Sequence, residues 1–273
     1  MIKYLFFPLF LIGLPLFTLA QEPDKQQLKT TEGIAIGVSD LELIDMLMVT
    51  VPGVGGDPRD MLRRQNIKPY MMPVRKVGAR GFELSYALAT CLEYYVNLND
   101  NYKDNLSPDY IALSLQSSGK SVNLRDAFLF LVDNGTVSAA IMPYDASNIP
   151  YAVNATQKFK IANYLHIFRD VTRGQQKVFE VRKALMRGNP VLIELQAGPS
   201  IRTLSHTTAW SPEKNGSELV PLIVVGYDEV EQVFEVQSCW GSNWGQSGYM
   251  NIRYDDFEKY AQNGYVIVPL QAY

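Results

Sequence analysis

The chain changes character at Pro190, and this change limits the folds open to it. Before Pro190, apolar residues recur three and four positions apart, which predicts helices. After it, short β-branched runs bounded by Gly, Asp and Asn predict strands. The predicted helices are 83–97, one from 107 onward, 123–133 and 179–187, and the predicted strands are 191–195, 222–225, 233–236 and 249–252. Helices early and strands late predict an α+β fold with two packed lobes.

Composition narrows the functions. The 273 residues, 47% of them hydrophobic, can bury one sizeable core or two lobes around a cleft. The net charge of −3 provides no basic field for phosphate backbones, so we expect no nucleic-acid partner. Two Cys and two His exclude a disulfide framework and a multi-ligand zinc site, and we predict no metal or cofactor. Cys91 and Cys239 form a disulfide in an oxidising compartment or remain buried thiols, and the sequence leaves both open.

The N-terminus indicates export. Lys3 precedes an apolar run over residues 4–19. Within residues 18–20, Thr18 and Ala20 offer small side chains at the two positions that a signal peptidase recognises. The run is short and contains two prolines and a glycine, which suits a cleaved signal better than a membrane anchor. We therefore predict a signal peptide at 1–20 and a periplasmic, cell-envelope or extracellular protein. No later stretch is long and apolar enough to span a bilayer.

Several motifs resemble one family. Residues 224–228 read V-V-G-Y-D, and residues 239–249 read C-W-G-x-x-W-G-x-x-G-Y. Residues 254–257 (Y-D-D-F) and 73–81 (P-V-R-x-x-G-x-x-G) add weaker matches in the right order. Together this pattern resembles the papain-like cysteine peptidases, with a C-terminal segment similar to bacterial members. The resemblance covers roughly residues 68–270.

The resemblance implies a papain-like two-lobe fold, with a helical left lobe, a β-rich right lobe and an interlobe cleft. On this basis residues 68–273 form the papain-like domain, and residues 21–67 form an N-terminal extension. The family's chemistry uses a Cys thiolate at a helix N-terminus, a His base, an orienting Asn and a Gln that helps to bind the oxyanion.

The resemblance places each of these four roles on an unsuitable residue. The Cys position falls on Glu83, and the Gln position falls on Val77. The His position falls on Val220, and the Asn position falls on Ser238. Because nucleophile and base act as a unit, their joint loss predicts a catalytically degenerate member with no catalytic residues at these positions.

Other residues offer weaker routes to catalysis. A shift of two residues places Ser85 at the nucleophile position, but it breaks the glycine match and still supplies no base. His206 is interpreted as an exposed loop residue and His166 as a strand residue. Glu83 at a helix N-terminus is interpreted as an anionic cap, since the helix dipole makes it a poor general acid. The sequence nominates no second carboxylate for a glycosidase.

The predicted function is therefore binding rather than turnover. We expect a groove lined by Glu83, Val220, Ser238 and Trp240 that holds a peptide, a glycan or a partner protein. One alternative is an active cysteine-type peptidase with a displaced site, which needs a Cys or Ser within reach of a His. Another is a structural subunit of a cell-envelope complex, which needs a large exposed apolar patch.

Overall fold

The computed structural model describes residues 33–101, 103–119 and 122–270, so the predicted signal peptide at 1–20 lies outside the described part. Within that part, seven strands form one antiparallel sheet in the order β2-β7-β3-β4-β5-β6, and β1 pairs with β4. The strands are β1 (Arg64–Asn66), β2 (Ile161–Phe168), β3 (Val191–Ala197), β4 (Glu218–Asp228), β5 (Val233–Gln237), β6 (Tyr249–Arg253) and β7 (Ala261–Pro269).

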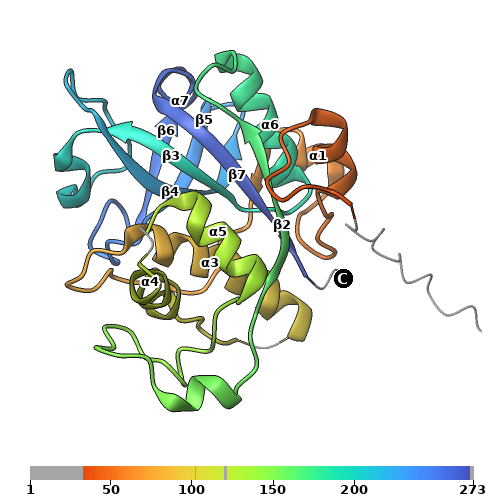
Figure 1. The fold of residues 1–273 in the computed structure, drawn as a ribbon. Coiled ribbons are helices and arrows are strands. Elements are labelled where there is room, and N and C mark those ends of the chain that lie inside the picture. Colours follow the sequence, from red (N-terminus) through yellow and green to blue (C-terminus); the bar gives the residue numbers. More distant parts are fainter. Residues whose placement is uncertain (1–32, 102, 120–121, 271–273) are drawn as a thin grey trace, which may run out of the picture. The chain divides into compact units, whose positions relative to one another are not determined.

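Helices cover the sheet from two sides (Figure 1). They are α1 (Leu41–Leu47), α2 (Pro58–Met61), α3 (Glu83–Asp100), α4 (Pro108–Ser117), α5 (Leu124–Asp133), α6 (Gly174–Met186) and α7 (Tyr254–Tyr260), with 3-10 turns η1 (Lys68–Tyr70), η2 (Tyr151–Ala155) and η3 (Pro199–Thr203). Figure 1 shows α3, α4 and α5 gathered together below the sheet, and α3 packs against β3, β4 and β7. The predicted α+β class with a helical and a β-rich lobe is confirmed.

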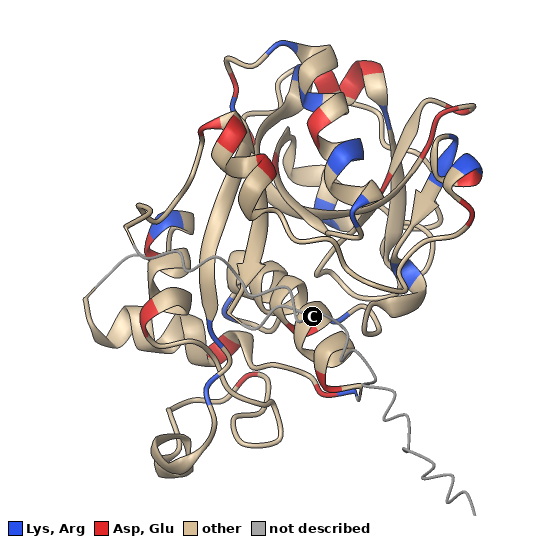
Figure 2. Ribbon diagram, turned by 90° about the vertical axis from the view of Figure 1, so that its right-hand side faces the viewer, with Lys and Arg blue, Asp and Glu red and all other residues tan. Residues whose placement is uncertain are grey.

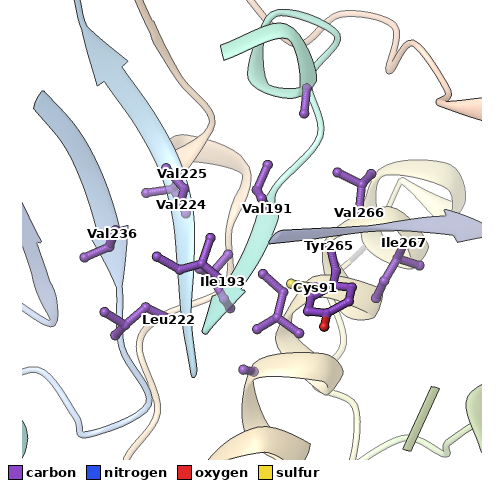
Figure 3. Packing of buried hydrophobic residues seen from close by; sticks show 14 of the residues in the cluster. Cys91, Val191, Ile193, Leu222, Val224, Val225, Val236, Tyr265, Val266 and Ile267 are labelled. Atoms are coloured by element: carbon purple, nitrogen blue, oxygen red, sulfur yellow. The ribbon is translucent and has the colours of Figure 1, made fainter. Parts of the chain in front are cut away.

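Helix α3 is the central element of the helical lobe. Its predicted start at Glu83 is confirmed, and it continues to Asp100, where Asn101 ends it in a left-handed conformation with φ 51°. Most of its side chains from Ser85 onward are buried, as its nearly continuous apolarity predicts. Figure 3 shows Cys91 of this helix among buried side chains of the neighbouring strands.

The predicted strands are present, and β4 is longer than expected. Residues 218–224 of β4 pair with β3, and residues 226–228 pair with β1. Strand β1 therefore lies beside β4 beyond the end of its pairing with β3. The sequence reading missed β7, although this strand lies between β2 and β3. Gln262 and Asn263 near the start of β7 interrupt the apolar pattern, so the apolar residues that follow them were not recognised as a strand. Helix α6 begins at Gly174, five residues before the predicted start at 179.

The described part of the N-terminal extension packs into the core. Ile44 of α1 and Ile67 are fully buried, and the amide of Val51 donates to the carbonyl of Arg187 at 2.8 Å. Val38 forms a bridge with Leu165 of β2. Residues 33–67 therefore extend the sheet-bearing lobe.

The distribution of charged residues and the apolarity of the helices both bear on the partners that this protein can bind. In the view of Figure 2, the positions of Lys and Arg and those of Asp and Glu are interspersed along the ribbon. Among the described residues, no helix combines the length and the apolarity that crossing a membrane requires.

The packing of α1 leads to a testable prediction. Ile44 is 0% exposed, whereas Leu41 on the same helix is 53% exposed. We expect Ile44→Ala to lower the free energy of unfolding by about 2–5 kcal/mol, because it leaves a cavity in the core. Leu41→Ala is the matched control and should change this free energy by less than about 0.5 kcal/mol. Urea unfolding measures both, and equal effects would contradict the integration of the extension.

Candidate functional site

A groove lies between the two lobes, with a cavity volume of about 330 Å³. Residues 81–84 at the start of α3 form one side, together with residues 122–124 before and within α5. Glu194 of β3 and Leu219 and Pro221 of β4 form the opposite side. We call this hollow the interlobe groove.

Glu83 carries the densest polar contacts at the groove. Its carboxylate accepts hydrogen bonds from Arg202, at 2.6 Å from Nε and 3.1 Å from Nη2, and from the indole Nε1 of Trp240 at 2.7 Å. The hydrogen bonds between Arg202 and Glu83 raise the pKa of Arg202 above its ordinary value. The prediction that Glu83 caps α3 was wrong, because Phe82 is the N-cap and makes no side-chain cap hydrogen bond. The arginine supplies a closer and stronger partner than the helix amides.

Arg202 is held by residues far away in the sequence. It belongs to η3, whose Ile201 is buried, and the indole Nε1 of Trp244 donates to the Ile201 carbonyl at 2.5 Å. Trp240 and Trp244 pack edge to face with ring centroids 5.2 Å apart. One tryptophan therefore binds Glu83, and the other fixes the segment that carries Arg202. Sequence reasoning missed Arg202 because nothing local in 198–204 marks it.

The segment before α3 is equally constrained. Arg75 donates to Glu93 at 3.1 Å and to the carbonyl of Leu106 at 2.9 Å, and burial raises the pKa of Glu93 to about 7. At Gly78 a Cβ would lie 1.8 Å from a carboxylate oxygen of Asp145, so a larger residue there would force the Asp145 side chain to move. These contacts position the chain that leads into Glu83.

The other predicted groove residues and the degenerate position Val77 are absent from the described groove lining. Val220 is fully buried, and its neighbours Leu219 and Pro221 line the groove, because adjacent strand residues point to opposite faces. Ser238 is buried, and its hydroxyl accepts a hydrogen bond from the amide of Trp240 at 3.2 Å. Val77 is half-buried, and its amide donates to the carbonyl of Cys239 at 2.6 Å. Trp240 reaches the site through Glu83.

In the described part of the chain, neither histidine is hydrogen-bonded to a candidate nucleophile. His206 is exposed, as expected, and adopts φ 54°. His166 lies on β2, also as expected, and its Nε2 bonds to Oδ1 of Asn263 at 3.0 Å. Burial lowers the pKa of His166. Among the described residues, no hydrogen bond joins either histidine to a Cys or Ser side chain.

Both cysteines are free and buried. The open choice between a disulfide and free thiols is therefore resolved in favour of free thiols. Burial raises the pKa of Cys91 and of Cys239. A thiol held in its protonated form is a poor nucleophile.

Glu194 is the second carboxylate at the groove, and sequence reasoning did not nominate it. Its Oε2 accepts a hydrogen bond from Nδ2 of Asn263 at 2.8 Å and lies 3.5 Å from the hydroxyl of Tyr265. Asn263 thus connects Glu194 with His166. The sequence signal that could have identified Glu194 is that it is the single charged residue within the apolar run 191–195.

Comparison with known proteins decides the family. Residues 93–269, more than half of the chain, match the family described as "Papain family cysteine protease". The chain belongs to this papain family. The match begins after Glu83 and Val77 and includes Val220 and Ser238.

Papain-family relatives show the same relationship. Oryzain beta chain of Oryza sativa subsp. japonica is 29% identical over 192 residues, which cover 68% of this chain and 40% of that protein. Procathepsin L of Mus musculus is 26% identical over 201 residues, which cover 69% of this chain and 58% of that protein. The chain thus covers less than two thirds of the length of these relatives.

Solved structures confirm the papain-like fold. Xylellain, a cysteine protease from Xylella fastidiosa, superposes with a TM-score of 0.62 at 18% identity, covering 86% of this chain and 96% of that chain. Digestive procathepsin L 3 of Tenebrio molitor superposes with a TM-score of 0.64 at 16% identity, covering 88% and 85%. At these identities the likeness concerns the fold alone.

The pair of Glu83 and Arg202 leads to a second prediction. In a double-mutant cycle, Glu83→Ala and Arg202→Ala should show a coupling free energy of unfolding of about 1–2 kcal/mol, because both groups are partly shielded from water. The control pair is Arg253 and Asp255, which are 3.8 Å apart with side chains 68% and 75% exposed. Its coupling should stay below about 0.5 kcal/mol. Urea unfolding gives both values, and equal couplings would contradict the role of the groove pair.

The thiols lead to a third prediction. In the folded protein at neutral pH, iodoacetamide should leave Cys91 and Cys239 unmodified, because both are buried and protonated. In guanidinium chloride both should be labelled. Mass spectrometry of the intact protein counts the added groups. Rapid labelling of either cysteine in the folded protein would reveal a reactive thiol and favour a displaced peptidase site.

Proposed function

We propose that this papain-family protein binds peptide segments in the interlobe groove without hydrolysing them. The observation that carries the proposal is the ion pair between Glu83 and Arg202 at the start of α3. By the resemblance, Glu83 occupies the position of the nucleophilic thiolate. The carboxylate is engaged by three donors and is not free to attack a carbonyl.

The surrounding groups support the loss of turnover. A guanidinium remains protonated in proteins, so Arg202 cannot act as a general base. Val220 stands at the expected His position and is buried, and Ser238 bonds to the backbone of its own segment. Among the described residues, no hydrogen bond joins a thiol to a histidine, and the raised pKa values of Cys91 and Cys239 oppose thiolate formation.

The groove retains the features of a peptide site. Apolar side chains from both lobes line it, including Phe82, Leu84, Leu124 and Leu219, and Leu219 is half exposed. The described residues 33–67 do not line it, so this part of the extension leaves the groove open. Apolar walls with a few polar groups suit a peptide side chain better than a glycan.

The location of the protein is part of the same proposal. The apolar run at 4–19 supports export, and the segment 254–257 supports a place in the bacterial branch of the family. A periplasmic, cell-envelope or extracellular protein would meet peptides there. The partner is therefore a peptide or an extended segment of another protein.

A structural subunit of an envelope complex is a second candidate, favoured by one surface. Leu62 and Phe179 are 60% and 53% exposed, and with Met186 they line a mainly apolar hollow of about 520 Å³ beside α6. Exposed apolar patches of this kind mark interaction sites. This surface is separate from the groove, so it does not compete with peptide binding.

Peptide turnover tests the proposed function. The purified protein is incubated with a mixed peptide library under reducing conditions, and mass spectrometry follows the peptides. We expect them to remain intact, with no difference between the wild type and the variants Glu83→Ala and His206→Ala, which control for contaminating proteases. Cleavage that disappears with His206→Ala would overturn the proposal and indicate an active peptidase with a relocated base.

A further inference from the structure

The charges around the interlobe groove do not balance. Glu83 is neutralised by Arg202, whereas Glu194 makes no salt bridge among the described residues. Among the residues that the structure describes, no Lys or Arg lines the groove. His166, connected to Glu194 through Asn263, is held neutral because burial lowers its pKa. Within the described lining of the groove, Glu194 is therefore the carboxylate that has no cationic partner.

The orientation of that carboxylate is set in advance. Asn263 donates to Oε2 of Glu194, and the amide of Asn263 is in turn held by the bond of its Oδ1 to His166. Tyr265 lies against the same oxygen and stacks on the His166 ring with centroids 4.4 Å apart. Within the described residues, Oε1 has no hydrogen-bond donor. A carboxylate fixed through one oxygen can bind a ligand through the other with little loss of freedom.

The walls suit a particular shape of ligand. Phe82, Leu84 and Leu124 on one side and Leu219 and Pro221 on the other offer apolar surface around Glu194. Lysine and arginine combine an apolar stem with a cationic end, and they bury the stem against such walls. Removing water from around the carboxylate strengthens its attraction for that cation.

We propose that the interlobe groove receives an arginine or lysine side chain of the bound peptide, and that Glu194 binds its cationic end. This inference rests on the proposed function, because it names the class of peptide that the same groove selects. A guanidinium or ammonium group donates to Oε1, while the stem packs between Leu219 and Leu124. Glu83 does not take this role because Arg202 already occupies it.

Two matched peptides test the proposal. One is an alanine-based peptide with a single arginine, capped at both ends, and the other carries citrulline, which keeps the shape but replaces the cation with a neutral urea. Calorimetry or NMR titration of the full chain should show the arginine peptide binding at least about tenfold more tightly. Added salt should reduce this preference, which needs no variant.

Two variants assign the effect to one residue. Glu194→Gln keeps the size of the side chain and an acceptor for Asn263, and it should reduce the preference to less than about twofold. Asp255→Asn removes the same charge from an exposed position on α7 and should leave the preference unchanged. A preference that survives in Glu194→Gln overturns the assignment to Glu194.

The remaining outcomes separate this inference from the proposed function. Equal affinity for both peptides in the wild type overturns the charge selection and leaves peptide binding standing. No binding by either peptide overturns both. The same samples are checked for cleavage by mass spectrometry. Cleavage of the arginine peptide with its preference intact would contradict the proposed loss of turnover and support the role of Glu194.

Discussion

The ion pair between Glu83 and Arg202 connects the parts of this molecule that matter for its function. Glu83 begins α3 in the helical lobe, and Arg202 lies on η3 after β3. Both members of the ion pair depend on the segment after β5. Trp240 donates to the carboxylate of Glu83, and Trp244 donates to the backbone carbonyl beside Arg202. The pair thus joins three segments that are distant in the sequence.

We propose that Glu83 and Arg202 replace the thiolate and the imidazolium of the family. This replacement keeps a negative and a positive charge at the site but removes the nucleophile and the base. In the family, a thiolate at the start of a helix faces a protonated imidazole, and the helix dipole favours the anion. Here a carboxylate stands at the start of α3 and faces a guanidinium. The cation comes from η3 and not from β4, so Val220 is free to join the core. The guanidinium of Arg202 stays protonated, so this pair stabilises the junction without supplying a general base.

The sequence predicted the local features well and the distant contacts poorly. Helix α3 and the strands β3, β4, β5 and β6 follow from periodicity and from the turn residues around them. Glu83 was found through the spacing of two nearby glycines. Arg202 lies 119 residues from Glu83, and no local pattern reports such a pairing. Glu194 was overlooked for a related reason, because its meaning depends on Asn263, which lies 69 residues away on the unrecognised strand β7.

The contacts of Trp240 and Trp244 give the tryptophan motif a structural role in this protein. The indole of Trp240 donates to Glu83, the indole of Trp244 donates to the carbonyl of Ile201 beside Arg202, and the two buried rings pack against each other. The motif therefore has a structural task that is independent of hydrolysis. Because these contacts keep Glu83 occupied, Glu194 is the groove carboxylate that the proposed basic side chain would meet.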